Sequence, residues 1–395
     1  MTGEAMDAGR PAGTRQGVIL MASAVMPVMA IVSLVPVLPM LSREFAATPG
    51  AEVLVPMMLT VPALCVALFS PVAGWLSDRV GRKRVLVAAL FLYGIIGLLP
   101  LVLHSLPLIL AFRILLGLNE AAIMTVATTM VGDYFEGKRR ERWIAIQTAV
   151  TSLSAIALIA IGGILGEAFG SRGPFLLYLL ALPIGVAAAL VLFEPATTAR
   201  SDARAAFPFR AISSIIAITL GAALLFYTLM LQIGTILEGV GITSPAVIGG
   251  VGAVANLGVV LGSLLFRHLS TAAPQRLLAA GFALSAVGYV GVGLSSAFWP
   301  TALLTVVACV GGGILLPTLL TWVLRVLPPF ARGQGTGLWT GTFFLGQFLA
   351  PILSIALGQA TGGLQATLVL LGCCAAAGAA ALAVFGARNE AGLRP

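Results

Sequence analysis

The sequence predicts an all-α integral membrane protein with twelve transmembrane helices. Hydrophobic residues make up 59% of the chain and charged residues only 9%, whereas soluble domains carry about 25% charged residues. Apolar runs of about 20 residues, the length that crosses a bilayer, recur along the whole chain. The segments between these runs alternate between basic and nearly uncharged, which is typical of loops on opposite sides of a membrane.

The first predicted span follows about 15 polar residues. Its apolar run is too long for the core of a signal peptide, and no small-residue cleavage site follows it, so we expect a retained helix. The twelve predicted spans are residues 17–41, 52–75, 84–103, 107–131, 143–166, 174–193, 211–237, 246–266, 276–296, 299–324, 335–358 and 364–386.

Basic residues gather on one side of this topology. Of the 22 Lys and Arg, all but Arg43, Arg113 and Arg172 fall in the termini or in alternate loops. Those loops are 79–84, 138–142, 200–210, 267–276 and 325–332. The positive-inside rule therefore predicts that both termini are cytoplasmic, which requires an even number of spans. The net charge of +8 then reflects membrane orientation, and we expect no nucleic-acid partner.

The chain is expected to consist of two six-helix halves. Residues 194–209 are polar, lie at the midpoint and read as a cytoplasmic linker between residues 1–193 and 210–395. A weak internal repeat supports this division, because the segment 74–79 is partly matched 188 residues later by the segment 262–267. Two parallel halves with substrate bound between them near the bilayer midplane is the transporter architecture that this pattern implies.

The most specific motif is the segment GWLSDRVGRKR between the second and third spans. It resembles the loop between helices two and three of the major facilitator superfamily, with matches at Gly74, Leu76, Asp78, Arg79, Gly81, Arg82 and Lys83. The resemblance implies an inner gate, in which Asp78 meets the start of helix eleven and Arg82 pairs with Asp133 at the end of helix four. A generic basic loop and a solvated charged rim are the alternatives.

Two ionisable residues, Arg113 and Glu120, lie clearly within a span. Charged groups there are costly, so each is a candidate functional residue. Seven residues separate them, which places both on one helix face about 10 Å apart, too far for a tight salt bridge. Burial favours a neutral carboxyl at Glu120, which could exchange a proton when its surroundings hydrate. A structural carboxyl bonded to Asn119 or to a neighbouring helix is the alternative.

The same helix carries a supporting motif. Arg113, Gly117 and Ala121 follow the pattern R-x-x-x-G-x-x-x-A, which resembles the helix-four motif of proton-coupled members of the superfamily. That resemblance implies a role for Arg113 in proton transfer and in the central cavity. Two features depart from multidrug antiporters: Leu158-Ile159 stand where a Gly-Pro pair is common, and the first span has no acid.

Uncharged residues at similar depth are the candidates for the rest of the substrate cavity. They are Met29, Tyr227, Gln232, Asn256, Trp322, Trp339, Phe343 and Gln347. Hydrogen bonds between helices are the competing role for the amides. A cavity of this composition suits an amphiphilic organic solute. A polyanion would require several basic groups, and Arg113 alone is available.

Glycine and proline mark close packing or bending. We expect bends at Pro36 and Pro39 and at Gly311–Gly313 with Pro317, and close backbone approach at Gly162. The four cysteines lie within apolar runs without metal-ligand spacing, so we interpret them as packing residues.

These observations predict a secondary transporter of a small organic molecule in the inner membrane. We expect proton-coupled export by a monomer that uses the proton gradient and no cofactor. An importer or uniporter is the main alternative, and a non-transporting receptor or scaffold is a distant one. An enzyme is not expected, because no catalytic cluster is present, and no G-x-x-x-x-G-K-[ST] motif suggests an ATP-driven pump.

Overall fold

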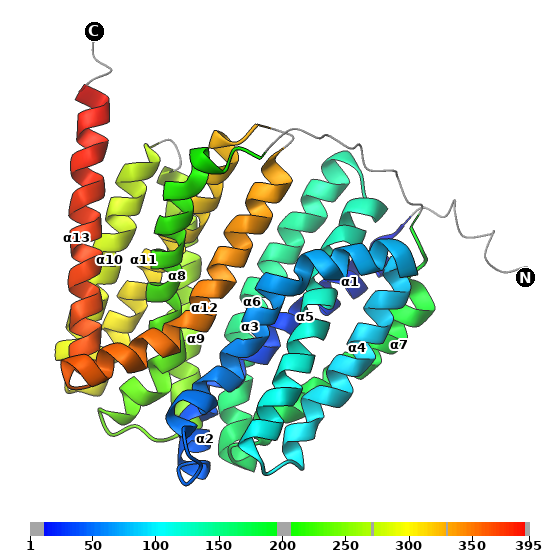
Figure 1. Ribbon diagram of the computed structural model, residues 1–395, viewed down its shortest axis with the longest axis horizontal. Coiled ribbons are helices and arrows are strands. Elements are labelled where there is room, and N and C mark those ends of the chain that lie inside the picture. Colours follow the sequence, from blue (N-terminus) through cyan, green and yellow to red (C-terminus); the bar gives the residue numbers. More distant parts are fainter. Residues whose placement is uncertain (1–11, 196–206, 270–271, 329–330, 392–395) are drawn as a thin grey trace, which may run out of the picture. The chain divides into compact units, whose positions relative to one another are not determined.

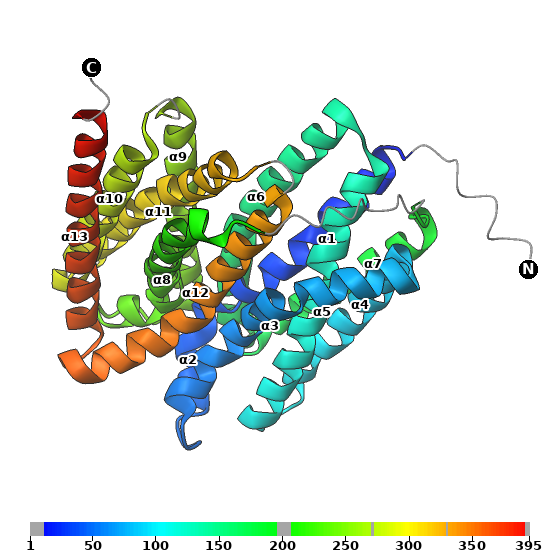
Figure 2. The same ribbon diagram turned by 45° about the horizontal axis from the view of Figure 1, so that its top comes forward.

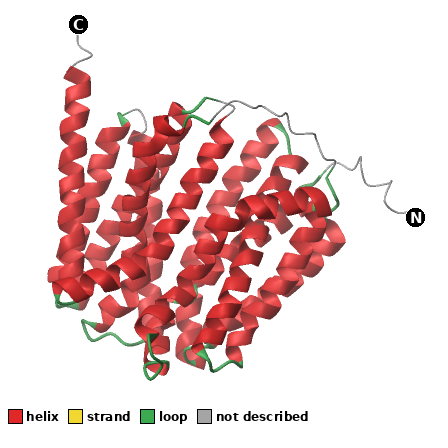
Figure 3. Ribbon diagram, viewed as in Figure 1, coloured by secondary structure: helices red, strands yellow, loops and turns green. Residues whose placement is uncertain are grey.

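The computed structural model describes residues 12–195, 207–269, 272–328 and 331–391. Throughout these ranges the regular elements are helices, and no strand occurs among them (Figure 3). Twelve helical segments in the described residues are long and apolar enough to cross a membrane. The predicted fold class and all twelve spans are confirmed.

The chain forms two compact units, Met1–Asp202 and Ala203–Pro395. Their division lies within residues 194–209, which we interpret as the linker, and residues 196–206 of that segment lie outside the described ranges. Each unit contains six of the twelve candidate spans. The two are therefore described separately as the N-terminal half and the C-terminal half.

The helices of the N-terminal half are α1 (Thr14–Val32), η1 (Val35–Val37), α2 (Leu38–Glu44), α3 (Ala51–Val80), α4 (Arg82–Leu98), η2 (Leu99–Leu101), α5 (Leu106–Tyr134), α6 (Gly137–Phe169), η3 (Gly173–Leu180) and α7 (Ala181–Val191). Those of the C-terminal half are α8 (Phe209–Glu238), α9 (Pro245–Leu269), α10 (Pro274–Leu294), α11 (Phe298–Val326), α12 (Arg332–Thr361) and α13 (Leu364–Ala391).

The two halves repeat one packing scheme. In the N-terminal half α5 packs on α3 and α4, α4 on α7, and α1 on α6 (Figures 1 and 2). In the C-terminal half α11 packs on α9 and α10, α10 on α13, and α8 on α12. The pairs correspond in chain order, so the weak sequence repeat reflects two copies of the same arrangement.

The basic segment 74–84 is mostly helical, which corrects our expectation of a loop. Helix α3 continues to Val80, and α4 begins at Arg82, so Gly81 alone separates them. Gly81 has a φ of 109°, a backbone conformation that residues with a Cβ rarely adopt. A helix of 30 residues is about 45 Å long, so its last turns extend beyond an apolar core of about 30 Å. Charged residues there need no loop.

The first predicted span is likewise not one continuous helix. It is broken after Val32, passes through η1 and continues as α2, in the region where we expected Pro36 and Pro39 to bend it. Proline lacks the N–H that an α-helix interior requires. Gly162 of α6 lies against this break, because a Cβ there would be 2.1 Å from the carbonyl oxygen of Ser33.

Helix α11 runs without interruption through Gly311–Gly313 and Pro317. These glycines lie at close contacts between helices, as a Cβ on Gly313 would be 2.2 Å from the Val259 carbonyl of α9. Pro317 leaves the Gly313 carbonyl without its usual helical donor. The hydroxyl of Ser263 on α9 donates to that carbonyl at 3.1 Å, so the proline strengthens a contact between helices.

Candidate transport site

Arg113 of α5 connects three neighbouring segments of the N-terminal half. Its side chain is buried, at 2% exposure. Nε donates to the Met58 carbonyl of α3 at 2.6 Å, and the two terminal nitrogens donate to the Tyr178 hydroxyl of η3 at 2.5 Å and to the Ala30 carbonyl of α1 at 3.0 Å. Three planar donor directions are thus used at once, which suits a guanidinium and not an ammonium group.

Two helix irregularities supply these carbonyl acceptors. The carbonyl of Met58 would normally bond to the N–H four residues later, but that residue is Pro62, which has none. The carbonyl of Ala30 would normally bond to the N–H of Leu34, which donates to Ile31 instead, at 3.3 Å, where α1 gives way to η1. Arg113 therefore stabilises the backbone where α1 and α3 depart from regular helix.

Two tyrosines extend this cluster. The Tyr178 hydroxyl, which accepts from Arg113, is also hydrogen-bonded to Tyr93 of α4, and the two rings lie 5.1 Å apart. Tyr93 donates its proton to the Met26 carbonyl of α1 at 2.6 Å. The proton between the two hydroxyls therefore belongs to Tyr178. Sequence reasoning missed both tyrosines, because neither lies near the motifs.

Glu120 lies two turns along α5 from Arg113 and has a different environment. It is 1% exposed, and neither carboxyl oxygen has a hydrogen-bond partner among the described residues. Asn119, the expected alternative partner, donates its amide to Leu115 of its own helix at 2.8 Å. The positive charge of Arg113 is close enough to act on this carboxyl. An apolar, unpaired position favours the protonated form of a carboxyl.

Gly117 sets the distance between α5 and α3 at this depth. A Cβ there would be 2.6 Å from the Cα of Pro62 and 2.8 Å from the Cβ of Cys65. The glycine of the R-x-x-x-G-x-x-x-A motif thus has a packing role. Met29, another predicted site residue, is fully buried on α1 next to the carbonyl of Ala30.

In the C-terminal half, most of the predicted cavity residues lie on α8 and α12, two helices that pack on each other. The ring of Phe343 lies 4.9 Å from Tyr227 and 5.7 Å from Trp339, to which it is nearly parallel. Gln232 of α8 donates to Ser354 of α12 at 3.2 Å. Gln347 is fully buried, and its amide has no partner among the described residues.

Two predicted cavity residues lie elsewhere. Asn256 donates its amide to Gly252 of its own helix α9 at 3.0 Å, and α9 packs on α11. Trp322 is half-buried on α11. Neither residue is on α8 or α12, because a similar predicted depth does not tell which helices pack together.

The predicted gate residues lie at the junction of α3 and α4. Arg82 donates to Asp78 at 3.1 Å and forms an ion pair with Asp133 near the end of α5. Arg79 stacks its guanidinium over the Trp75 ring at 4.2 Å. Gly74 faces α5, where a Cβ would be 3.7 Å from Thr125. The contact between the arginine and the acid that the resemblance implied is present.

Glu194 is a member of this junction that sequence reasoning missed. Its carboxylate accepts hydrogen bonds from the backbone N–H groups of Arg82 and of Lys83, the latter at 3.1 Å. These are the first N–H groups of α4, which have no partner within the helix, and the helix dipole favours an anion there. The segment after α7 is thus bound to the start of α4. In the sequence Glu194 is only an acid after an apolar run.

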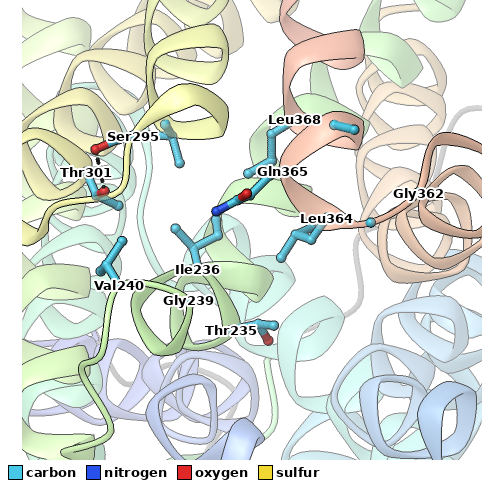
Figure 4. A pocket seen from close by; sticks show the side chains of 13 residues that line it. Thr235, Ile236, Gly239, Val240, Ser295, Thr301, Gly362, Leu364, Gln365 and Leu368 are labelled. Atoms are coloured by element: carbon cyan, nitrogen blue, oxygen red, sulfur yellow. Dashed lines mark hydrogen bonds between the residues drawn. The ribbon is translucent and has the colours of Figure 1, made fainter.

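A separate pocket of about 360 Å³ lies where α8 ends and α13 begins (Figure 4). Gln365 points into it, and the Thr301 hydroxyl bonds to Ser295 at its edge, at 3.0 Å. It contains none of the residues predicted for the site. In the described ranges no group of three or more His, Cys, Asp or Glu side chains is placed to hold a metal ion.

The described residues thus form two units with six candidate membrane spans each, and one unit holds a buried carboxyl without a hydrogen-bond partner among these residues. The family profile of the Major Facilitator Superfamily matches residues 20–237. The chain therefore belongs to this superfamily.

Characterised relatives include exporters. The chain is 32% identical over 109 residues to the bacillibactin exporter of Bacillus subtilis, a match covering 26% of each protein. It is 32% identical over 142 residues to the class B tetracycline resistance protein of Escherichia coli, covering 36% of this chain and 35% of that protein. The first relatives are therefore matched over about a third of their length or less. The class C protein of Escherichia coli is 24% identical over 87% of this chain and 90% of its own.

Solved structures share the fold. A bacterial homolog of the human lysosomal transporter Spinster, inward-facing and unoccupied, superposes with a TM-score of 0.76 at 17% identity, covering 95% of this chain and 98% of that one. The transporter PepTSo of the POT family gives a TM-score of 0.74 at 14% identity, covering 97% and 100%. At these identities the likeness concerns the fold alone.

Proposed function

We propose that this protein is a proton-coupled secondary transporter that exports a small amphiphilic organic molecule by alternating access. Its place would be the inner membrane, with both termini cytoplasmic, and it would work as a monomer driven by the proton gradient without a cofactor. The observation that carries the proposal is Glu120, a buried carboxyl without a hydrogen-bond partner among the described residues. Relatives named as exporters and resistance proteins support export.

Glu120 suits a coupling role because its charge state depends on its surroundings. In a dry environment the protonated form is favoured, since a charge without a partner is costly. When water or a polar substrate reaches the carboxyl, the proton can leave. A carboxyl held by strong hydrogen bonds would lack this freedom.

Arg113 is proposed to position this site. Three of its five N–H groups are committed to Met58, Ala30 and Tyr178, so it holds the local backbone of α1 and α3 in place. Its positive charge also acts on Glu120, which lies two turns further along α5.

Proton release from inverted vesicles tests the proposal. Vesicles carrying the protein are acidified inside, and a fluorescent pH probe reports proton release on addition of a panel of aromatic amphiphiles that includes tetracycline. We expect some compounds to release protons through the wild type but not through Glu120→Gln. Glu52→Gln, which alters an exposed acid in the first turn of α3, is the matched control and should behave as wild type.

A second measurement separates coupling from binding. Exchange of a responding radiolabelled compound across vesicles without a proton gradient should persist in Glu120→Gln, because only the coupled proton is lost. Equal proton release in wild type and Glu120→Gln would refute the role of Glu120. Substrate uptake without proton movement in the wild type would refute proton coupling itself.

A further inference from the structure

The contact surface between α8 and α12 contains polar side chains without partners next to a stack of aromatic rings. On α12, Trp339, Phe343 and Gln347 follow one another at intervals of four residues, so they lie on one helix face. Tyr227 on α8 contributes to the same surface, since its ring is 4.9 Å from that of Phe343, and the buried Thr228 is the next residue on α8. We refer to these five residues as the α8/α12 cluster.

Three members of the cluster carry buried polar atoms without hydrogen-bond partners among the described residues. They are the indole nitrogen of Trp339, the hydroxyl of Thr228 and both amide atoms of Gln347. Thr228 and Gln347 are 1% and 0% exposed. Leaving such groups unpaired destabilises a folded chain.

The unpaired state is local and not a general property of this half. Buried or half-buried threonines on α8, α11 and α12 donate to the carbonyl four residues earlier; they are Thr219, Thr305, Thr318 and Thr342. Gln232, one turn from Thr228 on α8, pairs with Ser354 of α12. The same two helices therefore provide a partner for the amide of Gln232 but none among the described residues for the amide of Gln347.

We propose that the α8/α12 cluster binds a planar conjugated ring that carries neighbouring hydroxyl and carbonyl oxygens. This names a substrate class for the transporter and rests on the proposed function. The rings of Tyr227, Phe343 and Trp339 offer faces and edges for stacking against a flat ligand. The indole N–H and the amide NH₂ donate to a carbonyl oxygen, and the amide oxygen and the Thr228 hydroxyl accept from a hydroxyl group.

Gln347 is the specificity-determining residue of this site. Its amide is the only group of the cluster that offers two donors and a strong acceptor together, so it can distinguish an oxygenated ring from a plain hydrocarbon. A site whose buried polar groups are paired only by the ligand discriminates strongly against analogues without the matching groups.

Fluorescence of Trp339 provides a direct assay. The chain has five tryptophans, and replacing Trp75, Trp143, Trp299 and Trp322 by phenylalanine leaves Trp339 as the single reporter in the purified full chain. Alizarin, 1,2-dihydroxyanthraquinone, is the probe, and anthracene has the same three rings without oxygen. A variant that retains only Trp75, which is on α3 of the other half, reports unspecific uptake into the detergent.

We expect saturable quenching of Trp339 by alizarin and no saturation at Trp75. Gln347→Leu should weaken alizarin binding by about tenfold or more, because the paired amide is lost, and should leave anthracene binding unchanged. Gln359→Leu, the same change about three turns along α12 at an exposed position, is the matched control and should bind alizarin as wild type. Equilibrium dialysis of alizarin against the chain with all tryptophans repeats the comparison without the reporter substitutions.

Thermal stability distinguishes a binding amide from a structural one. Without ligand, Gln347→Leu should keep or raise the melting temperature, because a buried unpaired amide is removed. A lower melting temperature together with unchanged alizarin affinity would overturn the proposal, as would equal affinity for alizarin and anthracene in the wild type. These measurements use no proton gradient, so their failure leaves the role of Glu120 standing, and the reverse also holds.

Discussion

The Nε–H of Arg113 donates to the carbonyl of Met58 at 2.6 Å, and Pro62 is the reason that this carbonyl is free. A proline in α3 and an arginine in α5 are thus complementary. Without Pro62 the Met58 carbonyl could bond within α3, and without Arg113 it would lose its hydrogen-bond donor.

Arg113→Lys should destabilise the N-terminal half by about 2–5 kcal/mol, because one ammonium group cannot replace three divergent donors to buried acceptors. The measurement is thermal or denaturant unfolding of the purified chain in detergent. Pro62→Ala gives the Met58 carbonyl a helical N–H donor, so Arg113→Lys should cost less in that background than in the wild type. An equal cost in both backgrounds would show that the Met58 contact contributes nothing.

The sequence is sufficient to predict the spans, because the apolar runs must exceed the bilayer thickness wherever they pack. The resemblance of the segment 74–84 to the superfamily's loop also implied the pairing of Arg82 with Asp133, which the structure contains. The length of the helices was predicted less well, because basic residues such as Arg79 and Arg82 extend a helix into water as readily as they form a loop.

The cluster around Arg113 was not predictable in detail. Its acceptors are backbone carbonyls at helix irregularities, and every residue has a carbonyl, so side-chain types contain no signal for them. Tyr93 and Tyr178 meet Arg113 only because α4 and η3 pack beside α5 and α1. Pro62 was the available clue, since it frees a carbonyl that a buried donor must then satisfy.

Glu194→Ala should loosen the start of α4, because the carboxylate binds two of its unpaired backbone N–H groups. We expect a loss of about 1 kcal/mol, typical for removal of a capping side chain at a helix N-terminus. Hydrogen exchange of the backbone amides of Arg82 and Lys83, followed by mass spectrometry, should be faster than in the wild type.

Glu136→Ala provides the control for this effect. Glu136 precedes the first residue of α6 but makes no capping hydrogen bond with its side chain. Its removal should leave the exchange at the start of α6 nearly unchanged. Equal acceleration in both variants would show that loss of a negative charge alone speeds exchange. The hydrogen bonds of Glu194 would then not be the cause.

Gly162→Ala should destabilise the contact between α6 and the break in α1 by about 1–3 kcal/mol, since the new Cβ would be 2.1 Å from the backbone carbonyl of Ser33. The matched control is Gly221→Ala in α8, where no atom lies within 4 Å of the added Cβ. That change should keep or raise stability, because alanine favours helix over glycine by up to about 1 kcal/mol. Equal melting temperatures for the two variants would contradict the close contact.

Tyr289 and Tyr93 occupy corresponding helices of the two halves and should respond differently to the loss of their hydroxyls. The Tyr289 hydroxyl bonds both to the Leu225 carbonyl and to the Leu229 N–H, at 3.1 Å for the latter. These two backbone groups are four residues apart and can pair with each other in α8, so Tyr289→Phe should cost about 1 kcal/mol or less.

Tyr93→Phe should cost about 1–3 kcal/mol, because it leaves the buried hydroxyl of Tyr178 without the partner that accepts its proton. Unfolding of both variants in detergent, beside the wild type, gives the two differences directly. A larger loss for Tyr289→Phe would mean that the hydroxyl of Tyr289 holds α8 in a shape that its own backbone does not adopt. The two halves would then share their helix packing but not the residues that maintain the shapes of α1 and α8.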